Sequence, residues 1–401
     1  MGSPCARNGG GCRGANLPGR DRGAEVTVTV SEVGGRRGTA RFVDVPWRLF
    51  SAARSPWVPP LRAVVRDALD ARRNPFYRDA DRALFVAERD GRLVGRVAAI
   101  ENRSHNRHHG DRVGFFGFFD CANDPAAATA LLDRAAAWLR ERGLTVARGP
   151  VSPSMNHESG LLVDGFDTPP AIMTPWNPSY YGELVEGAGF EPVQDLLGYD
   201  MPAGERLGVP DRVRRLAERT AARTGVTFRN LDPTILEKEA RKVLDLYCDA
   251  WSGNWGFVPP SWDDFWHTAK DLKAVLLPDF SFIAEVDGEI VGFMLMARDV
   301  NRVLRHVPSG RLWPTTVLRL LLSLPRVHRG RIVLLGLRRE YRHRGLLPLF
   351  AYEAARRAQE IGFEGAEASW ILADNDALTA PMAAMEFDAY KRWRIYEKPL
   401  R

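Results

Sequence analysis

Four arginines in a short polar segment are the residues whose types and spacing point most directly to chemistry. They are Arg338, Arg339, Arg342 and Arg344. The segment follows an apolar run of strand length, 332–337, and Gly345 then precedes a stretch, 346–361, with apolar residues at helical spacing. Free N–H groups at a helix start and the helix dipole favour an anion, and glycine allows its close approach. The pattern predicts a pyrophosphate cradle, with a solvated basic turn as the alternative.

A carboxylate on the next expected strand could move a proton. Glu364 and Glu367 are three residues apart, so strand alternation places them on opposite faces and at most one can face a site. Glu367 lies deeper in the strand and shares its face with Ser369. It is therefore the candidate general base. Two ordinary carboxylates at a strand entrance are the alternative.

The elements that would position these residues occur twice in the chain. Segment 282–293 matches 85–96 at seven of twelve positions, including an Asp-Gly pair that predicts a hairpin turn. Further matches in the same order are Val58 with Val258, Asn177 with Asn375, Gly117 with Gly336, and Gly143 with Gly362. The distance along the chain between matched residues is larger for the two glycine pairs than for the other pairs. The second copy must therefore have an extra segment before its central strand, and the first copy must have one after its helix. Several ordered matches indicate a duplicated domain.

Each copy has the pattern of a helical region, a β-hairpin, a strand, a helix, a strand and a final helix. This order predicts two tandem α/β domains with mixed, mostly antiparallel sheets flanked by helices. Residues 1–24, rich in Gly and Arg, are expected to be a disordered tail. The domains are expected at 25–200 and 226–401, joined by a linker at 201–225.

Length and composition limit the functional classes. A chain of 401 residues suits two domains, and a net charge of +6 is too small to predict a nucleic-acid partner. The four cysteines have neither C-x-x-C nor zinc spacing, so we expect no metal site and no disulfide framework. This cysteine pattern fits a reduced cytoplasmic setting. The longest apolar stretch, Leu312 to Leu324, is interrupted by Arg319 and is too short to span a bilayer.

The second copy resembles the GNAT superfamily of acyl-CoA N-acyltransferases. Arg342 and Gly345 match the family's loop, R/Q-x-x-G-x-G/A, while Leu347 stands where Gly or Ala is usual. Asn375 matches an asparagine after the next strand, whereas Met382 stands where the family often has a tyrosine acid. The resemblance implies that acyl-CoA, as acetyl-CoA or another acyl-CoA, binds the following residues: Leu337, Arg342, His343, Arg344, Gly345, Leu346, Leu347 and Asn375.

Helical spacing predicts the direction of the Leu347 side chain. Pro348 suits the first position of a helix, so Leu347 is expected at the helix boundary. Leu347 is three residues before Phe350 and seven before Ala354, which places it on the inward stripe of the helix. We therefore expect Leu347 to pack inward and to leave the cradle open.

The first copy resembles the family in a different part. Asn177, Tyr180, Tyr181 and Gly189-Phe190 look like the family's closing motif. The loop between strand and helix, Asp120 to Asp124, has no glycine and no base, and its two carboxylates would repel a pyrophosphate. The resemblance therefore implies a tandem GNAT protein with a degenerate first copy and acyl-CoA binding in the second.

The resemblance implies an enzyme that moves an acetyl or other acyl group from acyl-CoA to an amine, by direct attack of the neutral amine on the thioester. Whether the acceptor is a small molecule or a peptide stays open, as does the oligomeric state. A non-catalytic GNAT-fold ligand-binding or scaffold protein is the alternative. Leu347 and Met382 favour that alternative, whereas Arg342, Gly345 and Asn375 favour the enzyme.

Three other segments have two interpretations each. Aromatic residues crowd 251–266, where they either border an acceptor pocket or, as we favour, pack in the core. Nine arginines and no acidic residue occur in 301–339, which predicts a solvated basic insertion more readily than contact with lipid head groups. Ser152 to Gly160 contains Ser, His and Glu without triad spacing and is predicted to be a polar loop.

Overall fold

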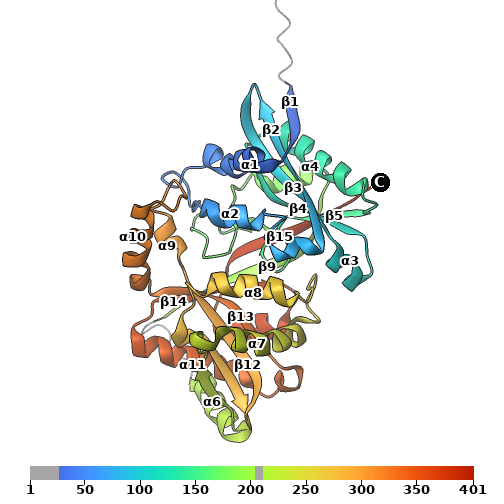
Figure 1. Cartoon of the computed structure of the whole chain (residues 1–401). Helices are drawn as coiled ribbons and strands as arrows, with labels where there is room; N and C mark the ends of the chain where they lie inside the picture. Colours follow the sequence, from blue (N-terminus) through green and yellow to red (C-terminus); the bar gives the residue numbers. More distant parts are fainter. Residues whose placement is uncertain (1–26, 204–210) are drawn as a thin grey trace, which may run out of the picture.

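A computed structural model describes residues 27–203 and 211–401 (Figure 1). The predicted disordered tail, 1–24, lies outside the described residues. One sheet of 13 strands runs through both halves of the chain. Its strand order is β1-β2-β3-β4-β5-β15-β9-β14-β13-β12-β11-β10, with β8 paired to β15. Among the described residues, no helix is both long enough and apolar enough to cross a lipid bilayer.

The first half of the chain supplies the following strands: β1 (Val28–Val33), β2 (Ala80–Arg89), β3 (Arg92–Asn102), β4 (Val113–Cys121), β5 (Val146–Gly149), β6 (Val151–Ser152), β7 (Glu158–Ser159), β8 (Leu161–Asp164) and β9 (Glu191–Pro202). Its helices are α1 (Gly35–Leu49), α2 (Arg62–Ala68), the 3-10 helix η1 (Pro75–Arg78), α3 (Arg103–His109), α4 (Pro125–Arg140) and α5 (Tyr181–Gly187).

The second half supplies these strands: β10 (Thr227–Asn230), β11 (Phe282–Val286), β12 (Glu289–Arg298), β13 (Arg329–Leu337), β14 (Gly365–Leu372) and β15 (Ala389–Pro399). Its α-helices are α6 (Asp211–Thr224), α7 (Leu236–Trp251), α8 (Trp262–Leu272), α9 (Asn301–Leu304), α10 (Pro314–Ser323), α11 (Leu346–Ile361) and α12 (Asp376–Ala384). Its 3-10 helices are η3 (Pro233–Ile235), η4 (Pro278–Phe280), η5 (Leu324–Arg326) and η6 (Arg339–Tyr341).

Both hairpins predicted from the internal repeat are present and use the same turn. Asp90 and Gly91 have φ angles of 51° and 72°, and Asp287 and Gly288 have 50° and 81°. Two consecutive positive φ angles define the tight turn that fits the twist of paired antiparallel strands. The Asp-Gly pair in each copy therefore performs the function that its sequence predicts.

The predicted alignment of Gly117 with Gly336 is wrong by three residues. Arg96 and Phe293 occupy the same position in the two hairpins, and they pair with Asp120 and Gly336 respectively. Asp120 is therefore the counterpart of Gly336. The alignment failed because the loop between the central strand and the helix is longer in the second half. The expected extra segment before β13 is present and contains α9 and α10, where the first half has only α3.

The two halves exchange their last strands. β9 leaves the first half and pairs with β14 of the second, and β15 returns from the second half to pair with β5 and β8 of the first. β9 and β15 also pair with each other in the middle of the sheet. All of these ladders are antiparallel. The sheet is therefore continuous across residue 200, where the sequence predicted a domain boundary, and each half completes the sheet of the other.

Helices cover both faces of the sheet in each half (Figure 1). In the first half, Leu132 of α4 and Phe42 of α1 belong to two core clusters on opposite faces. In the second half, Phe350 of α11 and Leu246 of α7 do the same. The predicted α/β class with a mixed sheet flanked by helices is confirmed.

Part of the predicted linker, 201–225, is the helix α6. Its Ala217 is fully buried in the cluster that contains Leu346 and Leu349 of α11. Arg212, near the start of α6, donates a hydrogen bond to the carbonyl of Ala384 at the end of α12. α6 is thus part of the core of the second half and lies against the helix that follows the basic loop.

Candidate active site

The predicted strand, basic turn, glycine and helix occur in that order at the end of β13. Gly345 has a φ of +83°, which only glycine adopts at little cost, and it precedes α11 without a side-chain cap. The helix begins at Leu346, so Pro348 is its third residue and not, as predicted, its first. Leu346 and Leu349 are buried whereas Leu347 is half-buried. Leu347 therefore lies at the edge of the buried stripe, and the inward direction predicted for it is confirmed only in part.

The guanidinium groups of the basic loop lie against the end of α7. Arg342 donates to the carbonyl of Ala250 at 2.6 Å, and Arg339 pairs with Asp249 at 3.4 Å. Both arginines and the neighbouring His343 are exposed. Exposed arginines beside an uncapped helix N-terminus can bind a pyrophosphate, because its oxygens can replace these surface contacts. The residues of this loop fit the phosphate end of an acyl-CoA.

The helix α6 limits the space on one side of this loop. A Cβ at Gly345 would lie 2.8 Å from the Thr220 hydroxyl oxygen, and Arg223 donates to the Arg344 carbonyl at 2.7 Å. Glycine at 345 is therefore required both by its own φ and by the close approach of α6. Arg223 and Arg344 are exposed and add positive charge at the edge of the predicted cradle.

The middle of β13 is more open than a central strand usually is. Val333 is left out of the ladder with β12, because Ile332 and Leu334 pair with successive residues of that strand. This is a β-bulge, and the parallel ladder with β14 ends at Ile332. Residues 332–335 are only half-buried, while Leu337 packs against the core under α11. β13 therefore borders accessible space where it separates from β14.

The same position in the first half is filled by its own chain. The Phe118 N–H donates to the Ser152 hydroxyl at 2.8 Å. The carbonyl oxygen of Val151 lies 1.6 Å from where a Cβ at Gly117 would stand. β6 therefore packs directly against β4, and the strands of the first half leave no gap for a ligand at this point.

The loop between strand and helix in the first half is also occupied. Asp124 caps α4 by accepting from the Ala127 N–H at 3.1 Å, and it pairs with Arg89 at 2.7 Å. The Cys121 N–H donates to the Tyr181 hydroxyl at 2.8 Å. A carboxylate and a tyrosine thus satisfy the groups that would otherwise meet a phosphate. These contacts support the prediction that the first copy binds no coenzyme.

The two asparagines of the closing motifs have different surroundings. Asn177 accepts from the Leu162 N–H at 2.7 Å and donates to the Leu162 carbonyl at 3.0 Å, so its side chain joins two segments of the fold. Asn375 precedes α12 and makes no side-chain cap hydrogen bond. Met382, which stands where the family often has a tyrosine, is buried in an apolar cluster against the sheet. Ligand binding by Asn375 stays a prediction.

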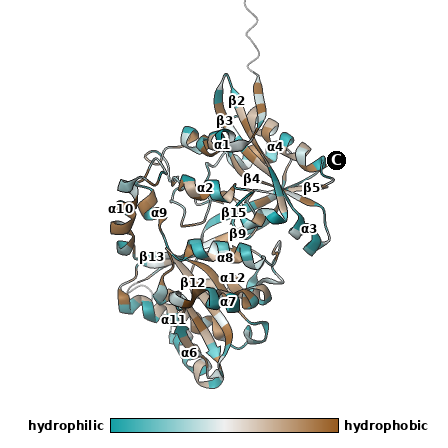
Figure 2. Cartoon of the chain, viewed as in Figure 1, coloured by the Kyte–Doolittle hydropathy of each residue, from teal (hydrophilic) through white to brown (hydrophobic). Residues whose placement is uncertain are grey.

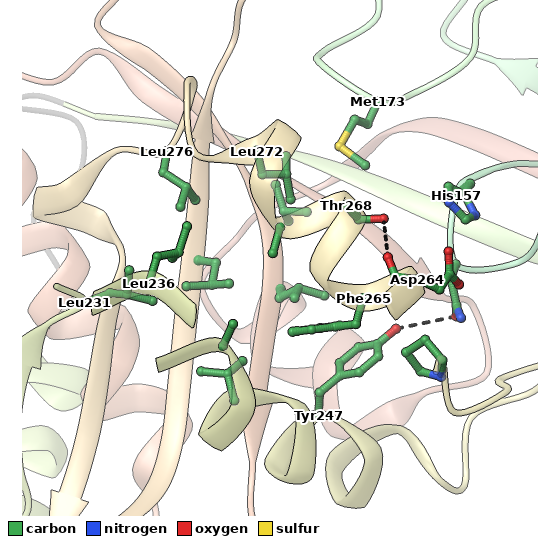
Figure 3. Close-up of a pocket in the computed structure, with 18 residues that line it drawn as sticks. His157, Met173, Leu231, Leu236, Tyr247, Asp264, Phe265, Thr268, Leu272 and Leu276 are labelled. Atoms are coloured by element: carbon green, nitrogen blue, oxygen red, sulfur yellow. Dashed lines mark hydrogen bonds between the residues drawn. The ribbon is translucent and has the colours of Figure 1, made fainter. Parts of the chain in front are cut away.

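An apolar pocket lies between α7, α8 and the strands β12 and β13 (Figure 3). It has a volume of about 800 Å³, counting its open mouth. Its apolar lining consists of Met173, Leu231, Leu236, Ala240, Val243, Pro260, Phe265, Ala269, Leu272, Leu276, Leu295, Val333 and Leu334. Because Val333 is the bulged residue of β13, the pocket reaches the place where β13 and β14 separate.

A residue of the first half helps to form the polar end of this pocket. His157, from the hairpin of β6 and β7, lies at the same end as Asp264, and Figure 3 shows the labelled leucines at the other end. The Nδ1 atom of His157 shares a hydrogen bond of 2.8 Å with the Ser154 hydroxyl. Burial lowers the pKa of His157, with Asp264 opposing the shift, so the imidazole is neutral near pH 7. The sequence predicted only a polar loop here.

Asp264 is the second ionisable group of this polar end. Burial raises the pKa of its carboxyl, and His157 and His267 oppose the shift. Its Oδ1 atom is buried and has no hydrogen-bond partner within residues 27–203 and 211–401. A buried carboxylate oxygen without a partner is costly unless a ligand or water completes its contacts. The Ser, His and Glu residues of 152–160, which were interpreted from the sequence as a polar loop, were a sequence signal for this end of the pocket.

A second, more polar pocket adjoins the first. It has a volume of about 700 Å³ and shares Asn156, Pro260 and Asp264 with the apolar pocket. Its other lining residues include Asn102 and His105 from the first half. The two pockets are therefore neighbours, and residues of both halves line them.

Glu367, the predicted general base, lies in a buried network instead of at a pocket. Its Oε1 atom accepts from the Ser369 hydroxyl at 2.5 Å, and its Oε2 atom accepts from the Tyr390 hydroxyl. Arg331 is 3.9 Å away and also donates to the carbonyls of Ile172 and Ser369. Glu367 and Arg331 are 1% and 2% exposed, so an acceptor amine does not reach this carboxylate. Its role as a base stays a prediction that this geometry disfavours.

The aromatic residues of 251–266 are divided between the core and the wall of the apolar pocket. Phe265 lines the apolar pocket. Phe257 is buried against Tyr247, with ring centroids 5.3 Å apart, and belongs to the core. Trp262 and Trp266 stack on each other along α8 with centroids 5.6 Å apart. The cluster is thus partly core and partly pocket wall.

Solved GNAT structures share this arrangement. A tandem GNAT protein from the clavulanic acid biosynthesis pathway aligns with a TM-score of 0.56 and 13% identity, covering 94% of this chain and 99% of its own. A glucosamine N-acetyltransferase region of a fungal GH3 β-N-acetylglucosaminidase aligns with a TM-score of 0.58 and 13% identity, covering 94% of this chain and 39% of its own. At such identities the likeness concerns the fold alone, which is that of a tandem GNAT protein.

Two curated relatives extend over nearly the whole chain. The bacterial ceramide synthase of Caulobacter vibrioides is 36% identical over 367 residues, covering 90% of this chain and 94% of its own. Protein YghO of Escherichia coli is 31% identical over 350 residues, covering 86% and 88%. No protein-family model matches the sequence. At these identities and coverages, the chain belongs to the family of these two proteins.

Proposed function

We propose that this protein transfers an acyl group from acyl-CoA to the amine of a long-chain amino alcohol, forming a ceramide-type amide. The fold and the family support acyl transfer in general. The acceptor class is suggested by the relative named as a bacterial ceramide synthase, because a ceramide is the amide of a fatty acid with a long-chain amino alcohol. Acetyl transfer to a small polar amine is the competing form of the same activity.

The observation that carries the proposal is the shape of the apolar pocket. Its leucine-lined end suits an alkyl chain, and its polar end, with His157 and Asp264, suits an amine and hydroxyl groups. The same pocket touches β13 at Val333, beside the gap between β13 and β14. An alkyl chain held among the leucines would thus present its amine to a thioester lying in that gap.

The reaction needs few groups from the protein. The amine nitrogen attacks the thioester carbon, a carbon–nitrogen bond forms, the carbon–sulfur bond breaks, and the coenzyme leaves as its thiolate, which takes a proton from water. His157, which is neutral near pH 7, would take the proton that the attacking amine loses. The backbone of Val333, which is outside the ladder with β12, would contact the developing oxyanion. The arginines of the basic loop would hold the pyrophosphate.

The test is thiol release from acyl-CoA by the purified full-length chain with different amines. We expect turnover with a long-chain amino alcohol and much less with ethanolamine, which has the same polar groups without the chain. Equal turnover with both would reject the apolar pocket as the acceptor site. Binding of acyl-CoA without thiol release for any amine would support the non-catalytic alternative.

A variant that fills the pocket makes the test specific to this site. Ala269 is half-buried and lines the pocket, so Ala269→Phe should raise the KM for a long-chain acceptor by about tenfold or more. Ala351→Phe is the control, because Ala351 is a half-buried helical alanine on α11 outside the pocket lining. Similar KM changes in both variants would show that the pocket does not select the acceptor.

A further inference from the structure

The outer face of α10 is apolar, which is the reverse of an ordinary surface helix. Val317, Leu318, Leu321 and Leu322 are 42%, 57%, 68% and 56% exposed. The side that faces the protein is formed by Thr316, which is buried, with Leu320 and Ser323, which are half-buried. A helix on a water-exposed surface normally buries its apolar stripe and exposes its polar one.

The apolar surface continues into the segment before α10. Leu312 and Trp313 are 50% and 54% exposed. We call these two residues and the four outer residues of α10 the α10 patch. Figure 2 shows α10 with brown, apolar colouring at the outer edge of the molecule. Exposed apolar patches of this kind mark protein or membrane contact sites.

The rim of the α10 patch is positively charged. Arg305, Arg311, Arg319 and Arg326 are exposed, and the sequence from 301 to 339 contains no acidic residue. Arg302, by contrast, forms an ion pair with Glu364 at 3.0 Å, so we do not count it in the charged rim of the patch. An apolar helix face with arginines at its edges is the pattern of a helix that lies in a membrane interface.

The first half holds α10 in place through the preceding loop. The Trp47 indole N–H donates to the Pro308 carbonyl at 2.9 Å, and the Arg62 side chain donates to the Ser309 carbonyl at 2.8 Å. The Arg62 backbone N–H donates to the Gly310 carbonyl, also at 2.8 Å. The patch is therefore fixed relative to both halves and to the pockets between them.

We propose that the α10 patch binds the surface of a membrane that contains anionic phospholipid. The apolar side chains would enter the boundary between head groups and acyl chains, and the arginines would meet the lipid phosphates. A second copy of the chain fits less well, since a symmetric contact would place two arginine rims against each other. The sequence favoured a solvated insertion, and it could not show that the leucines face outward.

This proposal does not depend on the identity of the acceptor, so its test uses binding and not turnover. The full-length chain is sedimented with vesicles of phosphatidylcholine alone and of phosphatidylcholine with phosphatidylglycerol. We expect binding to the anionic vesicles, weakened by high salt because the phosphate contacts are screened. The variant Leu321→Glu/Leu322→Glu should bind at least tenfold more weakly, since it places two carboxylates in the apolar face.

The matched control is Ile235→Glu/Ile361→Glu, in which the replaced side chains are 43% and 44% exposed but lie outside the α10 patch. It should bind vesicles like the natural chain. Circular dichroism of both variants confirms that they are folded. The proposal is wrong if the natural chain ignores both kinds of vesicle, or if the two double variants bind equally. Self-association that the Leu321→Glu/Leu322→Glu variant abolishes, without vesicle binding, would assign the patch to a second copy instead.

Discussion

Two ionisable residues, the buried Glu367 and the half-buried His157, are candidates for the general base, and they differ in what their atoms contact. Both carboxylate oxygens of Glu367 accept hydrogen bonds within the network of Ser369 and Tyr390. His157 uses Nδ1 on Ser154, and its ring lines the pocket. A general base must reach the proton it removes, so the geometry favours His157.

Replacing His157 by alanine should reduce kcat by about 10²- to 10⁴-fold, the usual contribution of a positioned base. The natural enzyme should keep its activity at pH 6.5 and lose it only at lower pH, because burial lowers the pKa of His157. Rate profiles against pH measure both effects. His108→Ala, at an exposed histidine of α3, should change neither. An unchanged kcat in His157→Ala would show that a group other than His157 acts as the general base.

Replacing Glu367 by alanine should mainly damage folding. Arg331 would lose its buried counter-charge, and such losses cost about 3–5 kcal/mol. Glu364→Ala is the control, since its pair with Arg302 is exposed and is worth at most about 1 kcal/mol. Urea unfolding gives both values. A stable Glu367→Ala protein without activity would instead support the predicted catalytic role.

At the scale of elements, the basic loop and the start of α11 differ from their counterparts in the first half. The loop in the second half is longer, carries exposed arginines and ends in a glycine with positive φ. In the first half the helix α4 is capped by Asp124. From this contrast we expect the second copy to bind an anion at this position and the first copy not to bind one.

Charge reversal by Arg342→Glu should therefore weaken acyl-CoA binding by about tenfold or more, because it removes a charged donor and adds repulsion at the cradle. Arg92→Glu makes the same charge change at an exposed hairpin position of the first half and should have little effect. Equilibrium binding of acyl-CoA to each purified variant is the measurement. Equal losses in the two variants would overturn the assignment of the coenzyme site to the second half.

At the scale of the whole molecule, neither half has a complete sheet. A fragment that begins at Val226 lacks β9, and its β15 has no β5 or β8 to pair with. Open strand edges and an uncovered apolar face promote aggregation. We therefore expect that the two halves cannot be separated into stable fragments, although each carries the full sequence repeat.

Expression of residues 226–401 alone should give protein that is poorly soluble or aggregated, judged by size-exclusion chromatography. Extending the fragment to 191–401 restores β9 but not the partners of β15, so it should improve solubility only in part. The full-length chain is the reference. A monodisperse 226–401 fragment that binds acyl-CoA like the full chain would contradict the exchange of strands as a source of stability.

Local residue patterns by themselves determined much of this fold. The repeated Asp-Gly turns, the apolar run before Arg338 and the glycine at 345 predict hairpin, strand and helix start, because each depends on neighbouring residues only. The predicted start of the helix, Pro348, was wrong by two residues, because the positive φ of Gly345 makes α11 begin at Leu346. The GNAT resemblance and the degenerate first copy also followed from such local motifs.

Only the tertiary structure decided how the two copies meet. The exchange of β9 and β15 depends on pairing between segments far apart in the chain, and no local pattern encodes it. For the same reason His157 from one half and Asp264 from the other meet at one pocket, while Glu367 is enclosed by Tyr390. The leucines of α10 could be placed on a helix from the sequence, but their outward direction depends on which face the rest of the protein covers.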